Sequence, residues 1–160
     1  MEIKDRELHR IAITAIIYND KGQYLVTKRS PHKKVWPNKW TVPGGGLEVD
    51  DYINEPVSTK ARQWYYALEK ALRREVTEEV NVEISKPIYL LDLTFIRPDN
   101  IPVLVLSYYA KYLSGEVKLD DDAVEYKWAT LAEAKDLDMI EGIWEELELV
   151  DKTLREQGDS

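Results

Sequence analysis

The chain has 160 residues, of which 44% are hydrophobic and 32% are charged. These proportions predict one domain with a packed core and exclude a disordered chain. The chain contains no cysteine, which excludes disulfide scaffolds, thiolate zinc sites and cysteine nucleophiles and fits a reducing compartment. Its formal net charge is −8, so it lacks the basic excess of a protein that binds nucleic-acid polymers.

No apolar stretch approaches the ~20 residues that a membrane span requires. The first ten residues, MEIKDRELHR, are charged and lack the apolar stretch of a secretory signal. We therefore expect no membrane association and a cytoplasmic location.

Two strands are expected near the N-terminus. Apolar residues alternate with partly polar ones over 11–17, and a second strand is expected over 23–28. Gly22 lies in the turn between them, where a positive φ is expected. Segment 30–39 holds two prolines and is expected to be a loop. The three glycines at 44–46 disfavour helix and strand interiors, so the backbone is expected to bend there or to approach another group closely.

The centre of the chain is expected to hold a helix and a hairpin. Residues 50–60 are typical of an exposed loop, and residues 62–80 have a helical pattern. Asn81 is the expected helix end because Asn tolerates the left-handed conformation. Segments 88–96 and 103–113 are rich in β-branched, leucine and aromatic residues and predict a β-hairpin.

The C-terminal part is expected to continue with a short strand over 124–129. Thr130 then caps a short helix over 131–135, and a last helix with one apolar face is expected over about 139–156. This order of elements predicts a single α/β domain over residues 1–160, with helices on either side of a mixed sheet.

One acidic cluster stands out in the expected central helix. At 100° per residue, Glu75, Glu78 and Glu79 lie within about 100° of one another on one face. Three ionised carboxylates this close raise one another's pKa, and a hard divalent cation such as Mg²⁺ would relieve the repulsion. Arg74 lies beside Glu78 and can offset part of it. The neighbouring arc carries apolar residues that can face the core: Leu72, Val76 and Val80.

An acidic cluster on a helix is, taken alone, usually a solvated face. Two features favour a functional site instead. The cluster lies at the C-terminal end of the helix, where the helix dipole disfavours anions. It also follows a glycine-rich bend, the kind of backbone that brings carbonyl and N–H groups close to a phosphate.

Gly45, Asp51 and the run REVTEEVNV at 74–82 resemble the signature of the Nudix (MutT-like) hydrolases, G-x5-E-x7-R-E-U-x-E-E-x-G-U, where U is a bulky aliphatic residue. The resemblance extends over about residues 10–135, because WTVPGGGLE at 40–48 is similar to the segment that opens the family signature. It implies the Nudix fold, in which a mixed β-sheet lies between helices in an α/β/α arrangement.

The chain departs from this signature in three places. Asp51 stands where the signature has Glu, and Asn81 stands where it has Gly. Between Asp51 and Arg74 lie 22 residues where the signature has seven, so the box, at about 45–82, carries 15 extra residues at about 52–66.

The insertion carries three adjacent aromatic residues, Trp64, Tyr65 and Tyr66. We predict that it starts the helix early and walls one side of the substrate cleft, which makes Trp64 and Tyr65 candidate substrate-binding residues. The alternatives are packing on the hairpin, packing on a partner subunit in a homodimer, and a tolerated surface insertion.

The resemblance implies cleavage of a pyrophosphate bond in a nucleoside diphosphate linked to another moiety, with Mg²⁺ or Mn²⁺ as cofactor. Carried over to this chain, the resemblance implies that the metal ligands are the carboxylates of Glu75, Glu78 and Glu79. The backbone carbonyl of Gly44 or Gly45 would complete the set. Glu75 would be a further ligand or the general base, and Arg74 would orient the carboxylates by charge-assisted hydrogen bonds.

Further site residues are expected outside the helix. Glu125 resembles a distal family glutamate that supplies a ligand or base, and its alternative is an exposed carboxylate at a strand end. Arg29 could grip a phosphate, or be a surface arginine. Glu48 could reach a metal or a ribose hydroxyl, and Asp51 is a weaker candidate because its side chain is shorter.

The first-choice substrate is a nucleoside triphosphate, split to monophosphate and pyrophosphate. ADP-ribose, a dinucleoside polyphosphate and a nucleotide sugar stay open, because the signature leaves the leaving group unspecified. A non-catalytic domain that senses a nucleotide is disfavoured, since such domains usually lose the box carboxylates that this chain keeps. Isoprenyl diphosphate isomerisation on the same fold relies on a cysteine, which this chain lacks.

Overall fold

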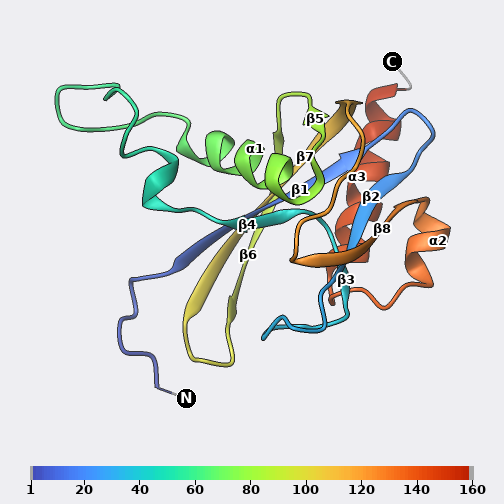
Figure 1. The fold of residues 1–160 in the computed structure, drawn as a ribbon, viewed down its shortest axis with the longest axis horizontal. Coiled ribbons are helices and arrows are strands. Elements are labelled where there is room, and N and C mark those ends of the chain that lie inside the picture. Colours follow the sequence, from blue (N-terminus) through green and yellow to red (C-terminus); the bar gives the residue numbers. More distant parts are fainter. Residues whose placement is uncertain (1, 159–160) are drawn as a thin grey trace.

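Residues 2–158 are described by a computed structural model, which confirms a mixed β-sheet between helices (Figure 1). The strands are β1 (Arg10–Tyr18), β2 (Tyr24–Arg29), β3 (Trp40–Thr41), β4 (Gly44–Gly46), β5 (Glu83–Ile84), β6 (Ile88–Ile96), β7 (Pro102–Ser114) and β8 (Ala123–Ala129). The helices are the 3₁₀ helix η1 (Val49–Asp51), α1 (Ala67–Val80), α2 (Leu131–Lys135) and α3 (Ile143–Gly158). In Figure 1, α1 covers one face of the sheet and α3 covers the other.

The sheet divides beside its central strand. β1 pairs in parallel with β7 along its whole length and antiparallel with β4 at Ala12–Thr14. It pairs with β2 only at its end, where Tyr18 lies opposite Tyr24. The two strands therefore diverge, with β3 extending the β2 side and β4 extending the β1 side. This divergence makes room for the candidate site.

Successive residues of β1 alternate between two hydrophobic cores, as expected for a strand buried on both faces. Ile13 and Ile17 belong to the core under α1, whereas Ile16 belongs to the core under α3. Each fully buried aliphatic side chain contributes about 1.5–3 kcal/mol. The predicted core face of α1 is confirmed, because its members are fully buried: Leu72, Val76 and Val80.

Several turns and helix ends follow from local chemistry, as predicted. Gly22 has a φ of 70°, and Asn81 ends α1 in the left-handed conformation with a φ of 59°. Thr130 caps α2 by accepting a hydrogen bond from the Glu133 N–H at 3.2 Å, and the Glu133 carboxylate accepts one from the Thr130 N–H at 3.1 Å. The predicted hairpin is also present, as the antiparallel pair β6 and β7.

The prediction that the three glycines disfavour a strand is wrong, because they form β4. Close approach explains why glycine is required there. A Cβ on Gly44 would overlap the carbonyl of Ile13, and a Cβ on Gly45 would overlap the carboxylate of Glu75. The absent side chains let β1 and α1 press against both sides of β4.

The predicted start of the central helix is also wrong. α1 begins at Ala67, because Arg62 and Tyr66 have left-handed φ values of 55° and 63°, which interrupt a right-handed helix.

The last helix likewise begins later than predicted, at Ile143. Met139 instead bridges to Trp40 of β3, and Gly142 has a φ of 93°, which separates the two segments. Among residues 2–158, no helix has the length and apolar content needed to cross a membrane.

Candidate active site

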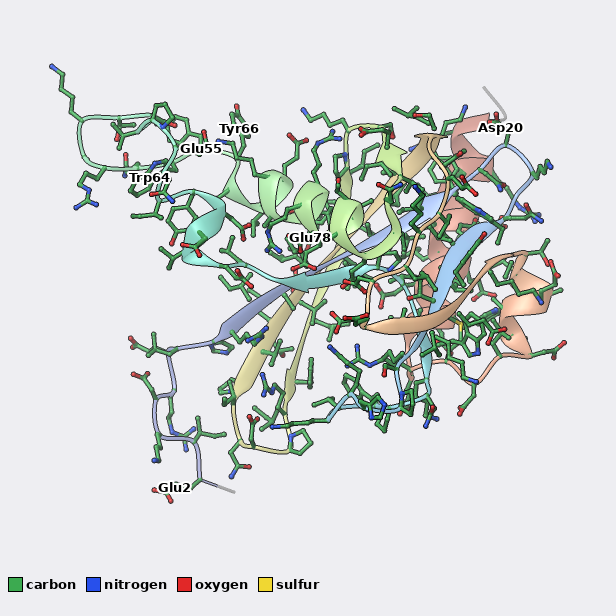
Figure 2. The ribbon with its side chains drawn as sticks, in the orientation of Figure 1. Glu2, Asp20, Glu55, Trp64, Tyr66 and Glu78 are labelled. Carbon is green, nitrogen blue, oxygen red and sulfur yellow. The ribbon has the colours of Figure 1, made fainter. Side chains whose placement is uncertain are left out.

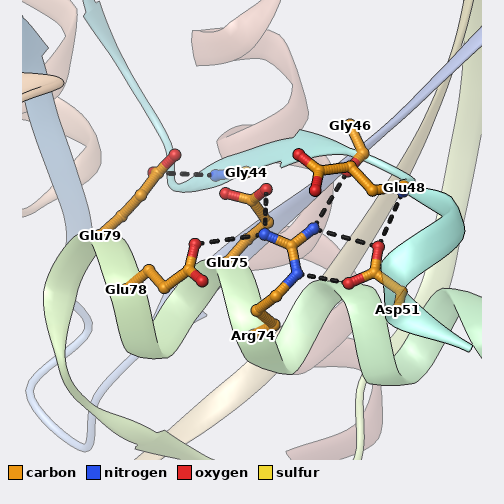
Figure 3. Close-up of polar contacts among 8 residues, drawn as sticks. All are labelled: Gly44, Gly46, Glu48, Asp51, Arg74, Glu75, Glu78 and Glu79. Atoms are coloured by element: carbon orange, nitrogen blue, oxygen red, sulfur yellow. Dashed lines mark hydrogen bonds and ion pairs between the residues drawn. The ribbon is translucent and has the colours of Figure 1, made fainter. Parts of the chain in front are cut away.

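The guanidinium of Arg74 lies at the centre of the carboxylate cluster (Figure 3). Its Nε donates to Asp51, and its Nη2 donates to the second oxygen of Asp51 at 3.1 Å and to the Gly46 carbonyl at 3.2 Å. Its Nη1 donates to Glu75 at 2.9 Å and to Glu78 at 3.2 Å. One side chain thus joins α1 to η1 and β4, which supports the predicted orienting role.

Asp51 anchors this arginine. Its carboxylate is almost fully buried and accepts the Glu48 N–H at 2.8 Å. The hydrogen bond from Arg74 is the main reason why the pKa of Asp51 lies below its ordinary value. The shorter side chain at this position therefore makes a two-point pair with Arg74.

The third carboxylate, Glu79, lies apart from Arg74 against the edge of β4. Its Oε2 accepts the Gly44 N–H at 3.2 Å. Burial raises the pKa of Glu79 to about 8, although the Gly44 hydrogen bond acts in the opposite direction. Burial also raises the pKa of Glu75, against the effect of Arg74. Glu75 and Glu79 thus lie where a positive charge would stabilise their ionised forms.

The donors at this end of α1 suit a hard divalent cation, because they are carboxylate and carbonyl oxygens. The glycines leave room for such a group, since a Cβ on Gly45 would fill the space next to Glu75. Within residues 2–158, however, no three acidic or histidine side chains are gathered closely enough to hold a metal ion. Arg74 engages two of the candidate ligands, Glu75 and Glu78.

A cavity of about 920 Å³ extends from the acidic cluster across the divided sheet towards α3. Glu75 and Glu79 line one part of it, and Ser107 and Glu146 line another. Basic side chains also line the cavity: Arg10, Arg29, Lys33, Lys34 and Arg97. The cavity therefore combines carboxylates with positive charge, as expected of a site for an anionic ligand.

Arg29 lines the cavity as predicted. Its Nη2 and Nε donate to the Val35 carbonyl at 2.8 and 3.1 Å, and Nε also lies 3.2 Å from the Trp36 carbonyl. Burial lowers its pKa, and the charge of Glu79 opposes that shift. Arg29 is thus a fixed cation near Glu79 that also holds the loop between β2 and β3.

The other predicted residues divide into two groups. Those that line the cavity with Arg29 are Gly44, Gly45, Glu48, Glu75 and Glu79. Arg74 and Glu78 join this group through the hydrogen bonds described above. Glu125, Trp64 and Tyr65 do not line it.

Glu125 lies on β8 opposite Lys28 and is exposed. Thr27 and Arg29, on either side of Lys28, line the cavity. The pairing of β2 with β8 shifts register between Lys28 and Arg29, and Glu125 does not line the cavity. The structure therefore favours the alternative, an exposed carboxylate on a strand.

The insertion projects beyond the N-terminal end of α1. Figure 2 shows Trp64 and Tyr66 there, far along the helix from Glu78. Trp64 donates from its indole to the Glu55 carbonyl at 2.8 Å and packs on Tyr52, with ring centroids 5.3 Å apart. The insertion thus packs on itself, and the structure does not bring Trp64 or Tyr65 to the cavity.

The polar residues of the cavity that had no predicted role include Thr14 on β1, Ser107 on β7 and Glu146 on α3. Each lies in an element that was expected only to form the core. The sequence offers one weak signal, because Glu146 directly precedes Leu147 on the predicted apolar face of the last helix.

Comparison with known proteins agrees with this geometry. A family model described as the NUDIX domain matches residues 8–150. The chain therefore belongs to the Nudix family, as its signature predicted.

Two relatives and one solved structure illustrate the relationship. An isopentenyl-diphosphate Delta-isomerase of Klebsiella pneumoniae is 32% identical over 133 residues, covering 80% of this chain and 64% of that enzyme. The nucleoside triphosphatase NudI of Escherichia coli is 28% identical over 129 residues, covering 74% of this chain and 80% of that protein. The MutT protein from Methanosarcina mazei Go1 shares the fold, with a TM-score of 0.71, 22% identity and coverage of 95% of this chain and 99% of that one.

Proposed function

We propose that this chain is a metal-dependent pyrophosphohydrolase that cleaves a phosphoanhydride bond of a nucleotide. A nucleoside triphosphate, split to monophosphate and pyrophosphate, is the proposed substrate. The observation that carries this proposal is the Arg74-centred cluster, which places Glu75 at a cavity lined by cations. The similarity to a nucleoside triphosphatase supports the choice of substrate.

The proposed metal ligands are the oxygens of Glu78 and Glu79, with the carbonyl of Gly44 or Gly45, and Glu75 is a further ligand or the general base. Mg²⁺ or Mn²⁺ is the proposed ion. When bound, such an ion supplies positive charge that neutralises and orients the pyrophosphate and acidifies the attacking water. Arg74 donates to one oxygen of Glu75 and to one oxygen of Glu78, so the other oxygen of each carboxylate stays available for the proposed roles.

The protein's own groups would supply positioning and proton transfer. Arg29 and Lys33 line the cavity and can hold the phosphate oxygens by charge-assisted hydrogen bonds. Glu75 is buried and its pKa is raised, which suits a general base near neutral pH. Its Oε1 accepts from Arg74, so Oε2 is the oxygen proposed to take the proton of the water.

Other substrates share the same reactive bond. ADP-ribose, a dinucleoside polyphosphate and a nucleotide sugar differ from a triphosphate only in the group beyond the pyrophosphate. A non-catalytic nucleotide sensor is the alternative of another class. Isomerisation is not proposed despite the similarity to an isomerase, because the family's isomerase chemistry relies on a cysteine and this chain has none.

The test is a panel of these nucleotides, incubated with the protein and Mg²⁺ or Mn²⁺. Released phosphate, pyrophosphate and nucleoside monophosphate are measured separately. Monophosphate and pyrophosphate in equal amounts from a triphosphate would support the proposal. Nucleotide binding without turnover of any compound would contradict it and favour the sensor.

A further inference from the structure

The part of the cavity beneath α3 contains a buried carboxyl group that the proposed hydrolysis does not use. Glu146 lines the cavity, yet only 6% of its surface is exposed. Burial raises its pKa, a hydrogen bond from Ser107 lowers it, and the charge of Glu145 raises it further. No lysine or arginine among residues 2–158 forms an ion pair with Glu146. A buried carboxyl in such surroundings favours a ligand that brings N–H donors.

Two hydroxyl groups orient this carboxyl. Thr14 and Ser107 lie opposite each other on β1 and β7, and Thr14 Oγ1 donates to Ser107 Oγ at 3.1 Å. Ser107 is 1% exposed, and its hydroxyl lies close enough to the Glu146 carboxyl to lower the pKa of that group. The chain of donors therefore ends at the carboxylate, and this part of the cavity presents acceptors to a ligand.

The floor next to these groups is apolar. The side chains that line the cavity beside them are Ala12 on β1, Val103 and Val105 on β7, and Leu93 on the neighbouring strand β6. An apolar floor with a few polar groups beside it is typical of a small-molecule pocket.

The floor also connects with the acidic cluster. Gly44, Thr14 and Ser107 lie side by side on β4, β1 and β7. Two strand spacings separate Gly44 from Ser107, which is about 10 Å. The Gly44 N–H holds Glu79, and Ser107 holds Glu146. A nucleoside with its first phosphate can span this distance, with the phosphate near Glu79 and the base near Glu146.

We propose that Glu146 recognises the base of the nucleotide, and that this base presents two adjacent N–H donors, as guanine does. The N1–H and N2–H groups of guanine can bond to the two carboxylate oxygens in parallel. Adenine offers a donor beside an acceptor, and that acceptor would repel a carboxylate oxygen. The inference rests on the proposed function in taking a nucleotide as the ligand, and it does not require hydrolysis.

Calorimetric titration of the wild-type protein tests this without any mutation. Four monophosphates are compared in the presence of Mg²⁺: those of guanosine, 1-methylguanosine, inosine and adenosine. Because a hydrogen bond to a charged group is strong, guanosine monophosphate should bind at least ~10-fold tighter than the other three. Equal affinities, or tight binding of the 1-methyl compound, would overturn the proposal.

Two variants test whether Glu146 is the residue that selects the guanine base. Glu146→Gln keeps the size of the side chain but replaces one acceptor by a donor, so it should weaken guanosine monophosphate binding at least ~10-fold and should not weaken binding of the adenosine compound. Glu145→Gln removes the same charge from the exposed neighbouring position and should bind like the wild type. An undiminished preference for guanosine in Glu146→Gln would overturn the proposal. If that variant does not fold, the comparison with the methylated nucleotide decides.

The two proposals fail separately. Selective binding of guanosine monophosphate by a protein that hydrolyses no nucleotide would contradict only the proposed hydrolysis. Equal hydrolysis of all nucleoside triphosphates, with equal binding of all monophosphates, would contradict only the role of Glu146.

Discussion

Asp51 and Arg74 form a two-point ion pair across 22 intervening residues, with Arg74 Nη2 3.1 Å from Asp51 Oδ2 and Nε paired to the other oxygen. The pair connects η1, which precedes the insertion, to α1, which follows it. The chain is therefore held in place on both sides of the insertion. Arg74 in turn holds Glu75 and Glu78. The ion pair is therefore expected to position the catalytic carboxylates.

Asp51→Asn should lower both stability and activity. The amide removes the charge from an almost fully buried partner of Arg74, so the free energy of unfolding should fall by about 1–3 kcal/mol. Urea unfolding and kcat measure the two effects. Asp50→Asn, at an exposed neighbouring position, is the matched control and should change neither. Normal stability and turnover in Asp51→Asn would show that the pair has no positioning role.

Hydrolysis should depend on a divalent cation and on the carboxylates of α1. Chelator should abolish activity, and Mg²⁺ or Mn²⁺ should restore it. Glu78→Gln keeps the size of the side chain and removes the charge, so kcat should fall ~10²-fold or more, which corresponds to about 2.7 kcal/mol. Glu69→Gln, near the start of the same helix, should retain activity. Full turnover in excess chelator would refute the metal requirement.

The metal-free protein should lose stability as the pH rises. The pKa of Glu79 is raised from 4.5 to about 8, so the native state binds this proton more tightly than the unfolded chain. The stabilisation is complete below pH 4.5 and is lost as the pH rises through about 8. Urea unfolding in chelator across this range measures it. Glu79→Gln should flatten this part of the profile, and Glu83→Gln, at an exposed position, should not. An identical slope in Glu79→Gln would rule out this source of the pH dependence.

Trp64→Ala should lower the local stability of the insertion and leave KM unchanged. The substitution removes the contact with Tyr52 and the hydrogen bond to the Glu55 carbonyl, so limited proteolysis should cut this segment faster. Tyr66→Ala is the control, because 76% of the surface of Tyr66 is exposed. A higher KM in Trp64→Ala with unchanged proteolysis would restore the original prediction that the insertion walls the cleft.

Features that depend on neighbours within one or two turns could be predicted from the sequence. The buried positions of Leu72 and Val76 follow from helical periodicity, and Arg74 reaches Glu78 because the two are four residues apart. The left-handed Asn81 and the capping box at Thr130 depend on local backbone chemistry. In each case the residues that decide the structure are adjacent along the chain.

The tertiary structure decided what depends on distant residues. The glycines of β4 form a strand because β1 and α1 approach them on both sides, and Trp64 packs on Tyr52 within the insertion instead of in the cavity. Thr14, Ser107 and Glu146 come from three elements that each appeared to serve only the core, and no periodicity joins them. The sequence by itself thus determined the family, the core face of α1 and the carboxylates on its other face. The shape of the cavity required the long-range pairing of β1 with β4 and β7, because a side chain's burial depends on every element packed against it.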